Sequence, residues 1–250
     1  MEENQAQAEP QEALGVKPEG PILASEQEIW HIQAVIYGAP GVGKTRLAAT
    51  APNPIFVECD PAGALSLRDQ DIPFFQINTM EDFRLAWGWL ALHMDDFETI
   101  VVDGVSRLQQ IGLNEIVPPS RLDLERKVYG RSTRQMQATF EGLTTFPHHI
   151  VFTCDERLRD DEITHLKVVV PGLTPVARNI LNRNCRLMGR LFAEVYMEDG
   201  VRKVRSVLQT NNDGQLWAKD TSGTLPPLIY RPNLTDIFNT MMGKEQGGDI

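Results

Sequence analysis

The sequence lacks several features that mark secreted and membrane-spanning proteins. Its three cysteines, Cys59, Cys154 and Cys185, are widely spaced, which is typical of reduced, buried thiols rather than of a disulfide framework or a zinc site. No run approaches the roughly 18 to 20 apolar residues that span a bilayer, and no basic segment followed by an apolar stretch opens the chain. We therefore expect a cytoplasmic protein without a membrane partner.

Positive charge is also scarce. The 24 Lys and Arg residues face 34 Asp and Glu residues, so the formal net charge is −10, which argues against a protein that coats nucleic acid by bulk positive charge. The acidic excess is uneven, because residues 1–28 carry seven glutamates and a single basic residue, Lys17, and contribute −6. A basic face on the rest of the chain is compatible with this composition.

Composition divides the 250 residues into three parts. Residues 1–27 are rich in Glu, Gln, Ala and Pro with few aromatic or β-branched residues, so we predict a disordered acidic tail. Residues 28–240 have the length of one large folded domain. Residues 241–250 are predicted to be a flexible C-terminus.

The predicted fold class is α/β, with a mainly parallel central sheet flanked by helices and antiparallel strands near the C-terminus. Up to residue 153, predicted strands at 32–37, 55–58, 99–102 and 150–153 alternate with predicted helices at 44–50, 81–94 and 132–146. Such alternation implies a parallel sheet covered on both faces. Beyond it the sequence predicts a strand at 164–170, a helix from about Pro175 to Phe192, and hairpin strands at 193–197, 201–208 and 215–219.

One glycine-rich segment joins the first predicted strand to the first predicted helix. It reads Gly38-Ala39-Pro40-Gly41-Val42-Gly43-Lys44-Thr45. In the pattern G-x-x-x-x-G-K-[ST], glycines let backbone N–H groups converge on phosphate oxygens, and the following helix presents its positive end. The segment therefore predicts a loop that holds the phosphates of a nucleoside triphosphate, with Lys44 on the β and γ phosphates and Thr45 on Mg²⁺.

Carboxylates follow two other predicted strands. Asp103 ends the apolar strand 99–102 and is the candidate second anchor for Mg²⁺, the Walker B carboxylate. Glu58 and Asp60 end the strand 55–58, where alternation places them on the same side. Either could orient the water that attacks a phosphate. We favour Asp60 because it lies nearer the end of the strand, and the alternative is that one of the pair only caps the turn.

Three segments resemble RecA-type recombinases. Residues 100–108 resemble the Walker B strand of that family, and residues 56–62 are similar to the strand that carries its catalytic glutamate, with Asp60 at that position. Residues 149–155 resemble the strand that ends at a γ-phosphate-sensing polar residue, a role that would fall to Thr153 or Asp155. Residues from about 156 to 173 then correspond in order to a mobile DNA-contacting loop.

The whole arrangement looks most like the short RecA-like ATPases of bacteriophages, the Sak-type single-strand annealing and recombination proteins. Shared features are the GxPGxGKT loop, a strand-end acidic pair followed by glycine, and the late segment Ala218-Lys219-Asp220. The resemblance implies ATP hydrolysis with Mg²⁺, action on single-stranded DNA, a homo-oligomer, a single-strand-binding protein partner and the cytoplasm of a host cell. It makes Lys219 a candidate finger, a basic residue that acts on the nucleotide of a neighbouring subunit. Thr221 stands where such phage proteins usually have arginine. The alternative is that Lys219 is only a surface lysine.

Other classes remain as alternatives. An AAA+ ATPase would normally carry Asp-Glu after the Walker B strand, whereas Gly104 follows Asp103 here, and the base-reading motif of a GTPase is missing. A small-molecule kinase would use Arg121, Arg126 and Arg131 as a lid. A nucleotide-dependent switch or assembly ATPase would act on a protein partner, with the acidic tail as its docking segment.

Candidate DNA contacts lie on the predicted helix from Pro175 to Phe192. It carries four arginines and no acidic residue: Arg178, Arg183, Arg186 and Arg190. A second basic cluster comprises Lys127, Arg131 and Arg134. Arginine binds phosphates and stacks on bases, so these residues are the predicted DNA-binding face; the alternative is a solvated face or one paired with acidic neighbours.

Overall fold

The computed structural model describes residues 29–116, 137–161 and 165–244. The predicted acidic tail and the last six residues of the predicted flexible C-terminus lie outside the described residues. So do the lid arginines of the kinase alternative and the second basic cluster.

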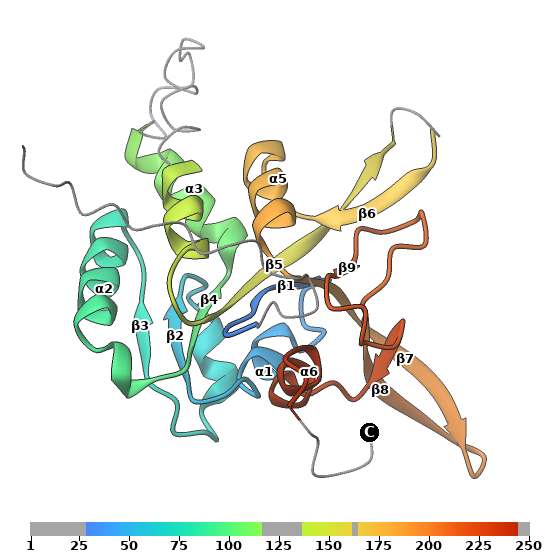
Figure 1. Ribbon diagram of the computed structural model, residues 1–250. Helices are drawn as coiled ribbons and strands as arrows, with labels where there is room; N and C mark the ends of the chain where they lie inside the picture. The colour runs from blue at the N-terminus through green and yellow to red at the C-terminus, as the bar shows by residue number, and fades with distance from the viewer. Residues whose placement is uncertain (1–28, 117–136, 162–164, 245–250) are drawn as a thin grey trace, which may run out of the picture.

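Within the described residues the strands form one large sheet (Figure 1). Their order along the sheet is β10-β8-β7-β1-β5-β4-β2-β3, with β6 added to β5 and β9 to β7. The strands are β1 (Gln33–Gly38), β2 (Pro54–Glu58), β3 (Phe74–Gln76), β4 (Thr99–Asp103), β5 (His149–Asp160), β6 (Lys167–Pro171), β7 (Leu187–Glu198), β8 (Val201–Gln209), β9 (Lys219–Asp220) and β10 (Leu228–Tyr230). Neighbours from β3 to β7 pair in parallel, whereas β6, β8, β9 and β10 pair antiparallel. The predicted fold class is confirmed.

Helices cover both faces of the parallel strands. They are α1 (Lys44–Ala48), α2 (Met80–Leu92), α3 (Val105–Ile116), α5 (Pro175–Asn184) and α6 (Leu234–Met241), together with helical residues 137–144 and short 3₁₀ helices at Gly63–Leu67 and Met94–Asp96. The predicted helix at 81–94 is confirmed as α2, which begins at a capping box between Thr79 and Asp82. Such a box satisfies backbone N–H groups that a helix start leaves open.

Side-chain alternation along the strands builds a core on each side of the sheet. Val35, Val57 and Val102 pack on one face, against α2, α3, residues 137–144 and α5. Their neighbours Ile36, Phe56 and Val101 pack on the other face, against α1 and α6. Because successive strand residues point to opposite faces, strands that are buried on both faces have the continuous apolar runs from which they were predicted.

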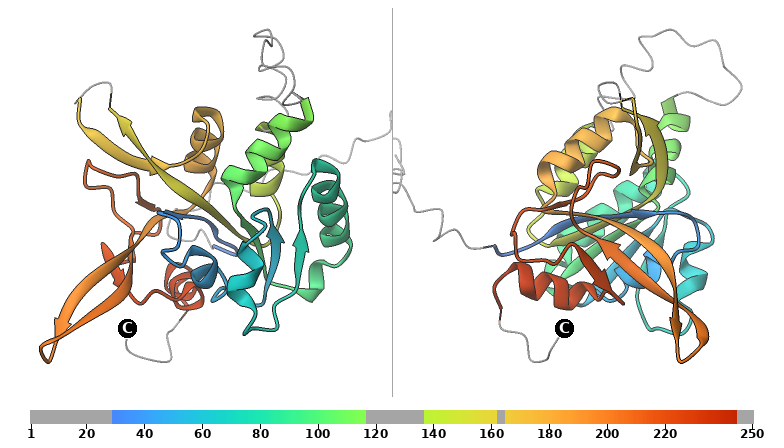
Figure 2. Two further views of the ribbon diagram at one scale, coloured as in Figure 1. Left: turned by 180° about the vertical axis from the view of Figure 1, so that it is seen from behind. Right: turned by 90° about the vertical axis from the view of Figure 1, so that its right-hand side faces the viewer.

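Two hairpins project beyond the helical layers (Figures 1 and 2). The strand predicted at 150–153 continues as β5 to Asp160, and its outer half, Glu156 to Asp160, pairs with β6. Strands β7 and β8 pair from Arg190↔Gln209 outward to Glu198↔Val201 and form the second hairpin. The outer half of β5 is therefore a direct extension of a strand that is buried in the centre of the sheet.

The predicted helix from Pro175 to Phe192 is wrong beyond Asn184, where α5 ends. Leu187 and Leu191 fit a helical period with Ile180, but both lie in β7, where Leu187 pairs with Ala34 of β1. Burial in the sheet overrides a periodicity that was compatible with a helix. The strand predicted at 215–219 is also shorter than expected, since only Lys219–Asp220 pairs as β9.

The strand order brings the predicted site residues to one edge of the sheet. Strand β5 lies between β1, which leads into the glycine-rich loop, and β4, which ends at Asp103. In register, Gly38 is opposite Asp155, and Glu58 is opposite Asp103. Ligands of open parallel sheets bind beyond the carboxyl ends of the strands, so this edge is where a nucleotide site is expected.

Candidate nucleotide site

The glycine-rich loop has the backbone conformation that its sequence requires. Gly41 and Gly43 have φ angles of 78° and 98°, a region that side chains with a Cβ rarely adopt. At Gly38, an added Cβ would lie 2.2 Å from the carbonyl oxygen of Leu191. The loop runs from the buried strand β1 directly into α1, so the predicted strand–loop–helix context is confirmed.

Lys44 lies folded over the loop. Its Nζ donates to the carbonyl oxygens of Gly38 and Ala39 at 3.0 and 3.1 Å and forms an ion pair with Asp155 Oδ1 at 3.1 Å. The Lys44 side chain is 12% exposed, whereas that of Asp155 is 57% exposed. The ammonium group is thus held at the mouth of the loop by partners that a phosphate could replace.

Thr45 and Asp103 meet below the loop. Thr45 Oγ1 donates to Asp103 Oδ2 at 2.6 Å, and the other carboxylate oxygen accepts a short hydrogen bond from Thr153. The Thr153 oxygen in turn accepts from the backbone N–H of Gly104 at 2.9 Å. Burial raises the pKa of Asp103, while the hydrogen bonds from Thr153 and Thr45 oppose that rise. The two predicted metal-binding side chains are therefore already adjacent.

Glu58 and Asp60 lie in different environments, although alternation predicted the same side. Strand β2 ends at Glu58, so Asp60 lies in the turn beyond it. Glu58 is fully buried, and its Oε1 accepts from the backbone N–H of Asp60 at 2.9 Å. Burial and the charge of Asp103 raise the pKa of Glu58 to about 8, so its carboxyl group keeps a proton at neutral pH.

Asp60 is exposed and lines the pocket. Its Oδ1 accepts from the backbone N–H of Ala62 at 3.1 Å. The residue that was favoured for orienting water therefore also caps the turn, and its role toward water stays a prediction. Glu58 instead lies beneath Gly63, where an added Cβ would come within 2.4 Å of its carboxylate oxygens.

A pocket of about 530 Å³ opens at this edge of the sheet. Besides the predicted loop and strand-end residues, its lining includes Arg46, Ser66, Ser106, Arg107 and Asp155. Sequence reasoning assigned no role to Arg107, which is exposed in the first turn of α3. Its position four residues after the Walker B aspartate, at the start of the helix that follows β4, was the available signal.

The donor set fits a magnesium-bound nucleotide. A threonine hydroxyl and a carboxylate are hard oxygen ligands, and Mg²⁺ is usually bound by one or two carboxylates together with substrate phosphates and water. Among the residues that the structure describes, no group of three His, Cys, Asp or Glu side chains could form a protein-only metal cage. Thr45 and Asp103 would hold the ion, and the phosphates would complete its coordination.

Comparison with protein families gives a match over residues 31–222 to a family described as an AAA domain. The chain belongs to this AAA domain family. The match supports the P-loop ATPase that the sequence predicts, and the resemblance to phage recombination proteins stays a prediction. Together with the loop and the Thr45–Asp103 contact, it makes the chain a P-loop ATPase domain.

Comparison of this AAA domain with curated proteins found no match. Among solved structures, one that is similar is the crystal structure of the flagellar accessory protein FlaH from Methanocaldococcus jannaschii. It is 12% identical, with a TM-score of 0.40, and the alignment covers 80% of this chain and 84% of that one. Within the described ranges, no helix of the AAA domain has the length and apolar content needed to cross a membrane.

The proposed finger of the AAA domain, Lys219, lies outside the nucleotide pocket of its own chain. Its Nζ donates to the backbone carbonyl of Asn182 at 2.6 Å, near the C-terminal end of α5. Burial lowers the pKa of Lys219. Cations stabilise the C-terminal ends of helices, which accounts for this contact within one chain, and a role toward a neighbouring subunit stays a prediction.

The four arginines predicted to contact DNA do not share one helix face. Arg178 is buried and 5% exposed, whereas Arg183 is exposed and lies 3.7 Å from Glu141. Arg186 and Arg190 lie beyond the end of α5, and Arg190 forms an ion pair with Glu156 at 2.8 Å. DNA contact by these residues stays a prediction, but it cannot come from a single helical stripe.

Proposed function

We propose that this protein hydrolyses ATP in response to single-stranded DNA and acts as a homo-oligomer in strand annealing or exchange. The observation that carries the ATPase part is the 2.6 Å hydrogen bond between Thr45 and Asp103. It joins the two predicted metal-binding oxygens directly below the phosphate loop. The choice of single-stranded DNA rests on the resemblance to phage recombination ATPases, and the course of β5 supports it.

In the proposed reaction, residues of this chain position the reactants. The loop amides and Lys44 hold the phosphates, with Lys44 exchanging its carbonyl and Asp155 partners for phosphate oxygens. Asp60 orients a water molecule and accepts its proton. The water oxygen forms a bond to the γ-phosphorus, and the bond to the bridging oxygen breaks with its electron pair on ADP. Mg²⁺, when bound, offsets the negative charge of the phosphate oxygens.

Strand β5 supports a connection between nucleotide and DNA. Thr153 contacts the Walker B carboxylate and Asp155 pairs with Lys44. The same strand then continues without interruption into the hairpin, through Arg157 and Arg159. If Asp155 moves when a phosphate replaces it as the partner of Lys44, the movement would therefore reach the residues of β5 that begin the hairpin. This is the segment that the resemblance assigns to DNA contact.

The test is ATP hydrolysis at low salt with and without single-stranded DNA, with Lys44→Ala as the blank. We expect stimulation that fades as salt rises, because binding to phosphates is electrostatic. Turnover that DNA leaves unchanged, with no detectable DNA binding, would overturn the recombination function and favour an ATPase that switches a protein partner. Turnover that requires a small acceptor would favour a kinase.

A further inference from the structure

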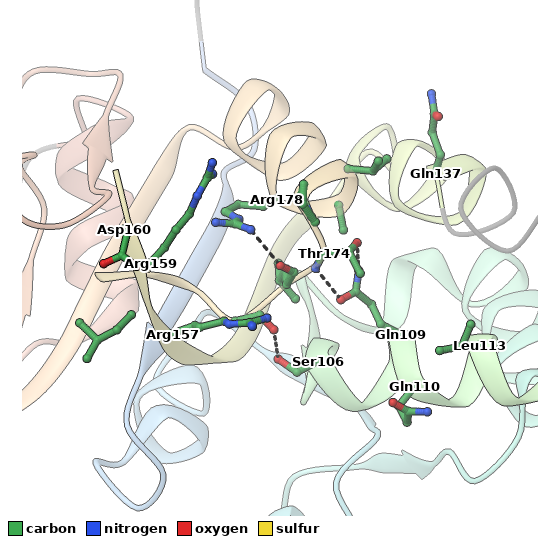
Figure 3. Close-up of a pocket in the computed structure, with 16 residues that line it drawn as sticks. Ser106, Gln109, Gln110, Leu113, Gln137, Arg157, Arg159, Asp160, Thr174 and Arg178 are labelled. Atoms are coloured by element: carbon green, nitrogen blue, oxygen red, sulfur yellow. Dashed lines mark hydrogen bonds between the residues drawn. The ribbon is translucent and has the colours of Figure 1, made fainter. Parts of the chain in front are cut away.

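A second cavity, of about 690 Å³, lies between α3, α5 and the β5–β6 hairpin (Figure 3). We call it the arginine pocket, because Arg157, Arg159 and Arg178 all line it. Arg157 and Arg159 are two residues apart on β5, a spacing that places both side chains on the same face of a strand. Arg178 reaches the pocket from the second turn of α5. None of these three arginines lines the nucleotide pocket.

Arg178 is the unusual member of the set. It is only 5% exposed, and its Nη2 donates to the carbonyl oxygen of Leu173 at 3.2 Å. Within the described part of the chain, its Nε and Nη1 have no hydrogen-bond partner. Trp217 lies against the guanidinium at 5.5 Å, but a ring contacts the face of the group and leaves its N–H edge open.

Two further arginines, Arg157 and Arg159, add positive charge around Arg178. Burial, and then the charges of Arg159 and Arg157, lower its pKa, yet a guanidinium stays protonated in proteins. Among the described residues that line the pocket, Asp160 is the acidic one, and it is exposed. A buried cation is normally paired or hydrogen-bonded. The open N–H groups of Arg178 therefore indicate an anionic ligand.

The start of α5 faces the same cavity. Thr174, Pro175, Val176 and Ala177 line it, and the Thr174 side chain makes no capping hydrogen bond to the helix. Instead the Thr174 hydroxyl accepts from Gln109 Nε2 at 2.9 Å. Backbone N–H groups at a helix start attract phosphate. The helix start and the buried guanidinium thus favour the same kind of ligand.

We propose that the arginine pocket binds a backbone phosphate of single-stranded DNA. This proposal rests on the proposed function and names its DNA site. A fork of guanidinium N–H groups matches phosphate oxygens. Leu158, 62% exposed, offers an apolar surface that borders the pocket from the strand face opposite Arg157 and Arg159, and a single strand presents unstacked bases as well as phosphates. Free phosphate shares the charge chemistry but has no group for that apolar surface.

The pocket also adjoins the nucleotide site. Ser106 lines both cavities, and its hydroxyl donates to the carbonyl oxygen of Gly172 at 3.1 Å. The backbone N–H of Gly172 donates to the carbonyl oxygen of Asp155, the partner of Lys44, at 2.6 Å. A DNA strand that is bound in the arginine pocket would therefore be connected to Lys44 of the phosphate loop through the hydrogen bond between Gly172 and Asp155.

The experiment is equilibrium binding of a fluorescein-labelled oligothymidylate to the full chain without ATP, over a series of salt concentrations. We expect Arg178→Met and Arg157→Gln each to weaken binding by about 10-fold, and Arg157→Gln to reduce the salt slope by about 0.7 for the lost phosphate contact. Arg202→Gln is the matched control, because Arg202 is exposed on β8 outside the pocket. We expect it to bind like the wild type.

Three results would overturn the assignment of the arginine pocket to single-stranded DNA. If the wild type binds and both pocket variants bind equally well, the DNA site lies elsewhere and the proposed function survives. If the wild type binds no oligothymidylate, both the pocket assignment and the recombination function fail. If inorganic phosphate binds in an Arg178-dependent manner but the oligonucleotide does not compete with it, the ligand is a free phosphate. Because Arg157 is exposed, its variant reports binding even where Arg178→Met does not fold.

Discussion

The two pockets at this edge of the sheet differ in how their charges are balanced. In the nucleotide pocket, Lys44 is satisfied by two carbonyl oxygens and Asp155, and Asp103 accepts from Thr45 and Thr153. In the arginine pocket, Arg178 is buried with open N–H groups. The first site has internal partners that a ligand replaces. In the second, the described residues supply no hydrogen-bond partner for two nitrogens of Arg178, and a ligand would supply one.

This difference predicts how each site responds to substitution. Removing a charged group from the nucleotide pocket should affect catalysis strongly, because that group acts on a developing charge. Removing an arginine from the second pocket should affect DNA binding and its salt dependence. Four experiments test these expectations, in order of decreasing effect.

The largest effect is expected for Lys44→Ala. It removes the cation that holds the phosphates, so ATP hydrolysis should fall by at least about 100-fold. Binding of oligothymidylate without nucleotide should match the wild type, since Lys44 does not line the arginine pocket. Steady-state hydrolysis and anisotropy measure the two quantities. Equal losses in both would show that the pockets are not separate sites.

Asp60→Asn should lower kcat by about 100-fold, because an amide cannot accept the proton of the attacking water. The affinity for ADP should change little, since the substitution keeps the shape of the side chain. Glu58→Gln is the comparison variant, and it should retain more of the activity because Glu58 is fully buried. If single-turnover kinetics show a larger loss of rate for Glu58→Gln than for Asp60→Asn, Glu58 is the residue that accepts the proton of the attacking water.

The next test is the pH dependence of stability. Glu58 has a pKa of about 8 in the folded protein, against an ordinary value of 4.5, so the native state keeps a proton that the unfolded chain loses. Its contribution to stability therefore falls as pH rises from about 4.5 to 8 and is constant above that range. Glu58→Gln does not titrate. Its free energy of unfolding relative to the wild type should increase by about 1 kcal/mol between pH 6 and 7.

Urea unfolding of both proteins at these two pH values measures the difference. A difference that stays constant would show that Glu58 ionises normally despite its burial.

The smallest effect is expected for Asp155→Asn. It removes the exposed ion pair that holds Lys44, so ADP should bind about two- to five-fold more tightly, in keeping with the small free energies of exposed ion pairs. Calorimetric titration measures the affinity. Glu194→Gln, which removes a comparable ion pair with Arg205 in the β7–β8 hairpin, is the control. Weaker ADP binding by the Asp155 variant would show that this carboxylate supports the site rather than competing for it.

The sequence predicted which residues meet at the nucleotide pocket, because the information for their placement is local. The loop from Gly38 to Thr45 contains both its backbone conformation and its functional groups, and Asp103 directly follows an apolar strand. Parallel pairing then brings these strand ends together without further information. The environments of Glu58 and Asp60 could not be predicted, because they depend on where β2 stops.

The arginine pocket could not be predicted, because Arg157 and Arg178 meet only through packing of a hairpin against a helix. The sequence assigned Arg178 to an exposed face with Arg186 and Arg190, since it extended α5 beyond Asn184. Helical periodicity was compatible with that extension, and only pairing of β7 with β1 excludes it. The contact of Lys219 with Asn182 is likewise a tertiary one.

Calorimetric binding of ADP, with and without Mg²⁺, to the wild type and to Thr45→Val tests whether Thr45 and Asp103 hold the ion of a bound nucleotide. We expect Mg²⁺ to tighten binding to the wild type and Thr45→Val to lose most of this gain, because the hydroxyl beside Asp103 is gone. Absence of nucleotide binding in the wild type, or an equal response to Mg²⁺ in both proteins, would show that Thr45 and Asp103 do not hold the ion of a bound nucleotide.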